Sequence, residues 1–353
     1  MLVPRPIHSR AFLLGRIVSR SIQTKAPVFA KRSVSTLERY RALMSKPTDM
    51  HRAFATEAPL VASHNYVAKR TAGFQQEKVR LDDGTSLPYY VYEGPMDTPM
   101  VDKRTYKLIR LANDLEALII HDPEADKASA AMDVRVGHLS DPEGLYGMAH
   151  FCEHLLFLGT KKYPRENEYS EYLSNHSGSS NAFTSLENTN YFFDVGHNHF
   201  EGALDRFAQF FLEPLFDPSC TEREIRAVDS EHKKNLQSDL WRSFQLEKSL
   251  CRASHAYSKF GTGNLETLWN KPRDMGLDIR AELLKFHEKF YSANMMKLVV
   301  LGRESPEQLT KWVAEKFSRV PNKENQVPVF PGSPLGQEQL GTQILFRTIK
   351  DVR

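Results

Sequence analysis

The sequence lacks any hydrophobic run long enough to cross a lipid bilayer, which takes roughly 18 consecutive apolar residues. Its longest apolar runs are short, as at Ala117–Ile120 and Leu298–Leu301, and they predict buried strands. The hydrophobic fraction is 41% and the charged fraction 26%, and both values are ordinary for a globular protein. We therefore expect a folded protein without a membrane span.

Cysteine is also scarce. The chain holds 3 Cys, an odd number, and none of them forms a C-x-x-C pair. A disulfide framework is therefore not expected, and this usage suits a reducing compartment. Cys152 lies among residues that could bind a metal, but its side chain should point away from the face that carries them. We predict that it is a packed core thiol and not a ligand.

Acidic residues are missing from the start of the chain. None precedes Glu38, whereas seven basic residues do: Arg5, Arg10, Arg16, Arg20, Lys25, Lys31 and Arg32. Subtracting this +7 from the overall +3 leaves −4 for the remainder. Nucleic-acid binders usually concentrate positive charge on the folded domain, so nucleic acid is not expected as a partner.

The same acid-free, Ser-containing N-terminus is typical of a mitochondrial transit peptide. Within it, Ala11–Ile22 could form a short amphipathic helix with Arg16 and Arg20 on one face. We predict the mitochondrial matrix as the location. The alternative is a disordered basic tail on a cytoplasmic protein.

Periodicity predicts three regions in the chain. Residues 1–70 show little pattern and are interpreted as presequence and linker. Residues 75–320 are predicted to form one α+β domain, with a mixed sheet and helices packed on it. Residues 321–353 begin with a Pro-rich linker and are predicted to start a second, truncated domain with a strand at Gln343–Arg347.

Within residues 75–320 the pattern predicts both strands and helices. The expected strands are Leu108–Leu111, Leu118–His121, Ser129–Val136, Asn181–Thr184, Tyr191–Val195 and Met296–Leu301. The expected helices are Gly144–Leu158, Arg165–Asn175, Phe200–Leu212, Thr221 to about Ser238, Trp241–Cys251, Ile279–Phe290 and Pro306–Phe317. Thr221 is the predicted N-cap of its helix because Glu224 follows three residues later, as in a capping box.

One predicted helix carries the motif H-x-x-E-H, as His150-Phe151-Cys152-Glu153-His154. Residues four apart share a helix face, so both imidazoles can reach one metal ion. Glu153 lies on the neighbouring edge of that face, where a carboxylate can hold a water molecule as a general base without binding the metal. A chance pair of histidines is improbable at this spacing. The motif predicts one catalytic zinc ion per chain.

A third protein ligand must come from elsewhere in the chain. The helix that contains Thr221 offers Glu224 and Glu231, seven residues apart and therefore on one face. Spacing alone does not rank the two, and any single helical Glu is more often a solvated surface charge.

Five stretches of the sequence resemble the insulin-degrading enzyme family of inverted zinc peptidases, the M16 metallopeptidases, and especially its fungal members. The resemblance covers the chain from about Tyr106 to its end. Its motifs are long and family-specific: His150–Pro164, Gly178–Ser185, Asp205–Leu212, Ala227–Asn235 and Lys259–Asn264.

The resemblance implies a role for each site residue. It implies His150, His154 and Glu231 as zinc ligands, and Glu153 as the general base. It implies Glu224 as a carboxylate that orients a ligand. It also implies that Asn181, Ala182 and Phe183 belong to an edge strand that takes up substrate backbone by strand addition. On residue type alone, Asn181 is equally well a turn residue.

The resemblance further implies an endopeptidase of short or unfolded peptides, built from two halves around a chamber and able to form a homodimer. On that view the chain is an N-terminal fragment whose partner is the missing C-terminal half. Donors from that half would polarise the substrate carbonyl, and each such donor is often worth about 10²–10³ in rate. We therefore expect zinc binding but weak cleavage by this chain alone.

Two alternatives remain from the sequence. One is a mitochondrial presequence-processing peptidase subunit, which the N-terminus favours and the LGTKKYP and KFGTGN stretches disfavour. The other is a truncated, non-catalytic zinc-binding subunit, which the intact H-x-x-E-H motif disfavours.

Overall fold

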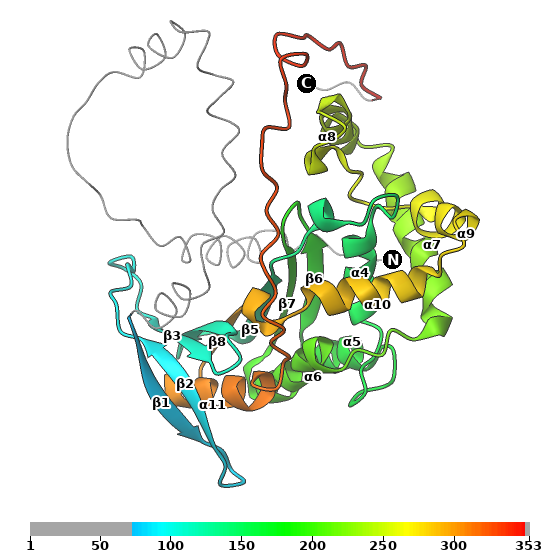
Figure 1. The fold of residues 1–353 in the computed structure, drawn as a ribbon. Helices are drawn as coiled ribbons and strands as arrows, with labels where there is room; N and C mark the ends of the chain where they lie inside the picture. Colours follow the sequence, from blue (N-terminus) through cyan, green and yellow to red (C-terminus); the bar gives the residue numbers. More distant parts are fainter. Residues whose placement is uncertain (1–72, 350–353) are drawn as a thin grey trace, which may run out of the picture. The chain divides into compact units, whose positions relative to one another are not determined.

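The computed structural model describes residues 73–349, and these residues build a single mixed sheet with helices packed on it (Figure 1). The sheet has eight strands in the order β1-β2-β3-β4-β8-β5-β7-β6. All neighbouring strands are antiparallel except β4 and β8, which are parallel. The strands are β1 Phe74–Arg80, β2 Ser86–Tyr92, β3 Thr105–Leu111, β4 Glu116–His121, β5 Lys127–Val134, β6 Ser179–Thr184, β7 Thr189–Gly196 and β8 Met296–Gly302. This confirms the predicted α+β fold class.

The helices connect distant strands of this sheet, and α4, α6 and α11 pack against it. The α-helices are α4 Met148–Leu156, α5 Glu168–Asn175, α6 Phe200–Leu212, α7 Pro218–Asn235, α8 Asp239–Leu250, α9 Lys271–Asp274, α10 Ile279–Phe290 and α11 Pro306–Phe317. Short turns of other helix types are η1 His138–Ser140, η2 His197–His199, η3 Ala256–Ser258, η4 Glu266–Asn270 and η5 Ala293–Met295. None of the helices in residues 73–349 has the length and apolar composition of a membrane span.

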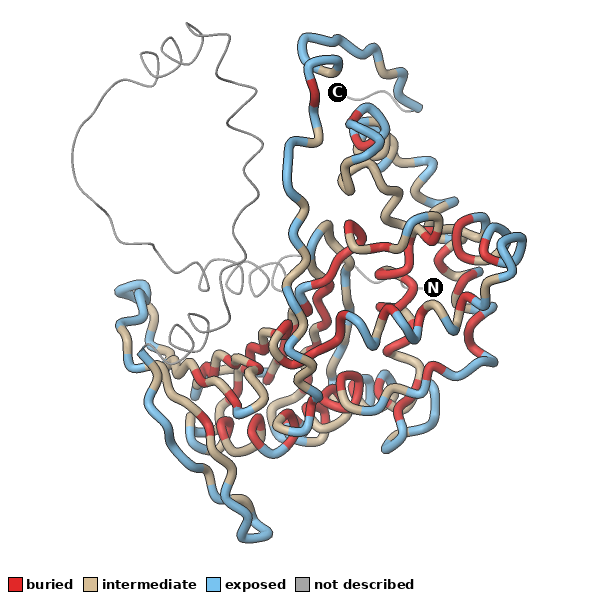
Figure 2. The backbone as a smooth tube through the Cα atoms, viewed as in Figure 1, coloured by how far each residue is buried: buried red, intermediate tan, exposed pale blue. Residues whose placement is uncertain are grey.

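The core lies between the sheet and its helices (Figure 2). Strand register aligns one row of fully buried side chains across the sheet: Ala117, Leu298, Met132 and Tyr191. Alternation of side chains along each strand places this row on one face, against the helices. On β6, Ala182 continues the same row because it pairs with Tyr191. Ala182 and Thr184, which is two residues further along β6, therefore lie on the face of the sheet that packs against α4.

Several element boundaries differ from the prediction. The helix predicted from Gly144 starts only at Met148, because Gly144 and Gly147 have the left-handed φ values of 80° and 92°. The helix predicted from Arg165 starts at Glu168, after a turn. The predicted strand at Gln343–Arg347 is wrong, because this segment pairs with none of the described strands.

The predicted N-cap at Thr221 is also wrong. The helix α7 starts at Pro218, and the Asp217 carboxylate accepts a hydrogen bond from the Ser219 amide at 2.8 Å. Pro at the first helical position costs no intrahelical hydrogen bond, so the Asp-Pro pair makes the stronger start signal. Thr221 lies buried within the helix instead. The hairpin of β1 and β2 was not predicted, and the transit-peptide prediction falls on residues outside the described range.

Candidate metal centre

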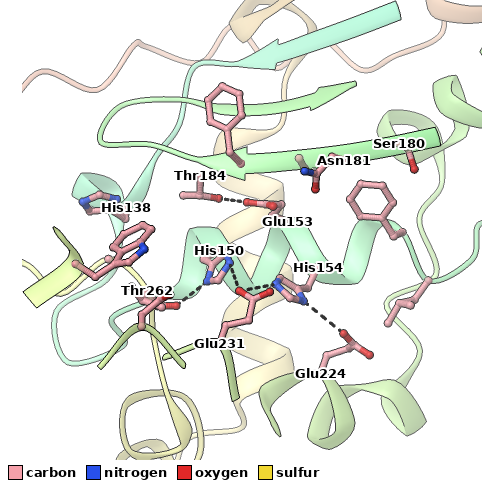
Figure 3. Close-up of a pocket in the computed structure, with 17 residues that line it drawn as sticks. His138, His150, Glu153, His154, Ser180, Asn181, Thr184, Glu224, Glu231 and Thr262 are labelled. Carbon is pink, nitrogen blue, oxygen red and sulfur yellow. Dashed lines mark hydrogen bonds and ion pairs between the residues drawn. The ribbon is translucent and has the colours of Figure 1, made fainter. Parts of the chain in front are cut away.

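The helix α4 presents the H-x-x-E-H residues on the side that faces α7 and β6 (Figure 3). Phe151, Cys152 and Leu155 are almost fully buried on the remaining faces of the helix, so packing fixes its rotation. The rings of His150 and His154 lie 4.8 Å apart between centroids. Cys152 is buried, and burial raises the pKa of its thiol to about 12, as expected for a packed core thiol.

A buried aspartate holds the N-terminal end of α4. Asp141 is 1% exposed and accepts hydrogen bonds from the amides of Gly147 and Ala149, at 2.6 and 2.8 Å. The Lys259 ammonium donates to the backbone carbonyls of Leu139 and Asp141, at 2.9 and 2.7 Å. The two bonds to Asp141 satisfy amides that no helical carbonyl can reach, and they fix the start of α4 two residues before His150.

His150 is oriented by a backbone carbonyl. Its Nδ1 lies 2.7 Å from the carbonyl oxygen of Thr262, which can only accept, so Nδ1 carries the proton. Nε2 is then the atom with a free lone pair, and it faces Glu231 on α7, with Nε2 and Oε2 3.4 Å apart. A carbonyl partner of this kind selects the tautomer that can bind a metal.

His154 lies between two carboxylates from α7. Its Nε2 is 3.8 Å from Glu231 Oε2, and its Nδ1 is 3.5 Å from Glu224 Oε2. Burial alone would lower the pKa of His154, but the nearby Glu224 and Glu231 carboxylates raise it to about 9. The His150 ring, and then the His154 ring, hold the pKa of Glu231 well below its usual range.

The structure distinguishes Glu231 from Glu224 as a possible metal ligand, which their spacing in the sequence could not do. Glu231 faces the Nε2 atoms of both histidines, whereas Glu224 faces the outer nitrogen of His154. Ligand atoms of His150, His154 and Glu231 all lie within 4.8 Å of one another. Among the described residues, this is the one group of three or more His, Cys, Asp or Glu side chains with such spacing.

Glu153 lies beside this cluster and is 7% exposed. Its Oε2 accepts a hydrogen bond from the Thr184 hydroxyl of β6 at 2.5 Å. Burial raises its pKa, and this effect outweighs the neighbouring histidines and the Thr184 hydrogen bond, which lower it. A carboxyl group with a raised pKa holds a proton more readily near neutral pH.

The cluster opens into a cavity of about 510 Å³ between α4, α7 and β6. The edge strand β6 contributes one wall, including Asn181, Ala182 and Phe183. Alternation along the strand places Ala182 on the face of Thr184, and Asn181 and Phe183 on the opposite face. Phe183 is 45% exposed.

Several residues of this cavity wall were not predicted from the sequence, among them His138, Thr184, Trp241 and Thr262. They come from η1, β6, α8 and the loop after η3, and no spacing pattern links them to the motif on α4. For Thr262, the Gly261-Thr262-Gly263 turn was a usable signal, because glycine-rich turns permit close backbone approach.

The fold and the cluster together define a class of protein, the inverted zincins, in which H-x-x-E-H lies on a helix. Comparison with family models agrees. The insulinase model of peptidase family M16 matches residues 116–254, and the M16 inactive-domain model matches residues 278–353. The chain belongs to the M16 peptidase family.

Known relatives share this part of the chain at high identity. Human insulin-degrading enzyme is 58% identical over 252 residues, covering 71% of this chain and 25% of the relative. The A-factor-processing enzyme of Saccharomyces cerevisiae is 54% identical over 255 residues, covering 72% and 25%. The crystal structure of pitrilysin superposes with a TM-score of 0.68 at 37% identity, covering 76% and 27%. The chain spans about a quarter of the length of these relatives.

Proposed function

We propose that the chain is the zinc-binding catalytic domain of a metalloendopeptidase of the insulin-degrading type, which hydrolyses bonds in short or unfolded peptides. The observation that supports this most strongly is the convergence of His150, His154 and Glu231 beside the buried Glu153. The names of the relatives support the substrate class, since two of them are called insulin-degrading and A-factor-processing enzymes.

The donor set fits zinc. Zn–N and Zn–O bonds of about 2.0–2.2 Å in a tetrahedral site place neighbouring donor atoms roughly 3.4 Å apart. The Glu231 oxygen lies 3.4 Å from His150 Nε2 and 3.8 Å from His154 Nε2, so small side-chain shifts suffice. Three protein ligands leave a fourth position open, which is the pattern of a catalytic and not a structural zinc site.

In this proposal Glu153 carries out the proton transfer. Bound zinc would polarise the scissile carbonyl and lower the pKa of a coordinated water molecule. Glu153 accepts the proton of the attacking water on its carboxylate, holds it in the buried site, and donates it to the leaving amine. Thr184 keeps the carboxylate in place through its hydrogen bond to Oε2. Glu224 orients His154 through Nδ1.

We also propose that peptide substrates add as a strand along the edge strand β6, past Asn181, Ala182 and Phe183. Ala182 lies on the face of Thr184 and lines the cavity, so a larger side chain there would occupy space beside β6. We expect Ala182→Leu to raise KM for a fluorogenic peptide while zinc binding is unchanged. An unchanged KM would contradict the placement of substrate on this strand.

Zinc affinity should rise with pH up to about pH 9, because the carboxylates beside the half-buried His154 raise its pKa to about 9. This folded pKa lies above the ordinary 6.5. The protonated ring therefore stabilises the metal-free fold fully below pH 6.5, and this stabilisation is lost as pH rises through about 9. Because zinc must displace that proton, affinity should increase about tenfold per pH unit in this window. Chelator competition across the window checks this, and a flat affinity would contradict it.

The direct test of the proposed function is metal content and peptide cleavage by the 353-residue chain. We expect one zinc per chain and cleavage that 1,10-phenanthroline abolishes. Cleavage should increase when the part of a relative that the chain does not span is supplied in trans. Stoichiometric zinc without cleavage under either condition would instead support a non-catalytic subunit, and preferential cleavage of presequence peptides would support a processing peptidase.

For location, we propose the mitochondrial matrix on the basis of the acid-free N-terminus. Imaging of the chain with and without residues 1–37 tests this, and an identical cytoplasmic distribution of both forms contradicts it.

A further inference from the structure

A buried lysine–histidine pair lies at the wall of the cavity, outside the cluster of His150, His154 and Glu231 and its neighbour Glu224. Lys248 on α8 is 0% exposed, and its Nζ lies 2.6 Å from Nε2 of His138, which is 5% exposed and lines the cavity. The Lys248 ammonium also lies near the rings of Phe244 and Tyr257, at 5.3 and 5.5 Å from their centroids. Burial lowers the pKa of His138 to about 3, so the ring is neutral and its Nε2 accepts from Lys248.

The His138 ring packs directly on the loop that orients His150. A Cβ atom added at Gly261 would lie 2.5–2.6 Å from the Cγ, Cδ2 and Nδ1 atoms of the ring. Gly261 does not have a positive φ. Contact with the His138 ring, and not backbone conformation, therefore accounts for a glycine at this position. The next residue, Thr262, supplies the carbonyl that accepts from His150 Nδ1 at 2.7 Å.

The other end of this loop is held against α4 itself. A Cβ atom at Gly147 would lie 2.2 Å from the Cα of Gly263, so the two backbones are in close contact at the start of the helix. The Thr262 carbonyl is therefore positioned between two fixed points: the His138 ring at Gly261, and α4 at Gly263.

We propose that Lys248 and His138 are positioning residues for the metal site. They set the place of the Thr262 carbonyl, and through it the tautomer and orientation of His150, without touching the metal or the substrate. This inference rests on the proposed function, since it assigns His150 to zinc. Partners of ligating histidines typically change metal affinity by about 10–100-fold when they are removed.

The test uses Lys248→Met, which keeps an unbranched side chain and removes the donor to His138. We expect zinc affinity, measured by chelator competition on the full chain, to fall roughly tenfold, and the visible spectrum of the Co²⁺ form to change. The double variant His138→Phe/Lys248→Met replaces the polar pair with an apolar pair and keeps an aromatic ring against Gly261. It should recover most of the lost affinity.

Lys316→Met is the matched control. Lys316 is also buried, at 8% exposure, and its Nζ lies 3.1 Å from Glu201 Oε1 on α6, away from the cavity. We expect it to lower Tm without changing zinc affinity. If Lys248→Met lowers Tm in the same way but binds zinc like wild type with an unchanged Co²⁺ spectrum, the pair is merely structural and the proposal is overturned.

A second variant applies if Lys248→Met does not fold. Gly261→Ala should lower zinc affinity, because the added methyl group meets the His138 ring and displaces the loop that carries the Thr262 carbonyl. Wild-type zinc affinity and an unchanged Co²⁺ spectrum of Gly261→Ala would overturn the proposal. Wild-type chain that binds no zinc would instead contradict the proposed function, so the two failures are distinguishable.

Discussion

Replacement of Glu153 with Gln is expected to abolish peptide cleavage while the chain keeps its zinc. Gln keeps the size of the side chain and an oxygen that can accept from the Thr184 hydroxyl, so packing around this 7% exposed site should be preserved. It cannot accept a proton from water. Loss of a general base typically costs roughly 10²–10⁴ in rate, and we expect kcat to fall by that amount with KM little changed.

Glu222→Gln is the matched control for this experiment. Glu222 is an exposed α7 residue that pairs with Arg226 at 2.6 Å, so its substitution should change neither cleavage nor metal content. A Glu153→Gln chain that cleaves like wild type would rule out Glu153 as the general base. If the variant loses zinc together with activity, Glu153 contributes to metal binding, and the separation of the two roles is wrong.

Replacement of Glu231 with Ala is expected to cause the largest loss of zinc affinity among the α7 carboxylates. Glu231 faces the Nε2 atoms of both histidines, at 3.4 and 3.8 Å, and its removal leaves two protein donors. Glu224→Ala removes only the partner of His154 Nδ1, for which a loss of about 10–100-fold is typical. We expect the zinc affinity of the Glu231→Ala variant to fall clearly further than that of the Glu224→Ala variant.

Chelator competition on the two variants measures this difference, with Glu222→Ala as the control on the same helix. Circular dichroism should show that all three chains stay folded, because none of the three carboxylates is fully buried. Zinc binding by Glu231→Ala as tight as by wild type would exclude Glu231 as a ligand. A greater loss in Glu224→Ala than in Glu231→Ala would reverse the assignment of the two carboxylates.

Elements with strong local signals were predictable from sequence. The helices α6, α10 and α11 have the predicted bounds, because their apolar periodicity is regular and a side chain caps α10 and α11. The strands β1 and β2 were missed for the opposite reason. Most of β1 is exposed and polar, and β2 contains Pro88, so neither shows the apolar alternation that identifies a strand.

The candidate site also has features that the sequence predicts and features that depend on the folded chain. The pairing of His150 and His154 depends only on helix geometry, so the motif alone predicted it. The choice between Glu224 and Glu231 depends on how α7 lies against α4, which periodicity does not determine. The contacts of Thr184, Thr262 and His138 depend on residues up to 112 positions apart, and only the folded chain brings them together.

The central claim is that His150, His154 and Glu231 hold one zinc ion. The most direct measurement is an anomalous difference map at the zinc edge from crystals of the zinc-loaded chain. We predict a single strong peak bonded to Nε2 of His150, Nε2 of His154 and a carboxylate oxygen of Glu231. The account is contradicted if this position shows no peak, or if the peak is bonded to Glu153 or Glu224 in place of Glu231.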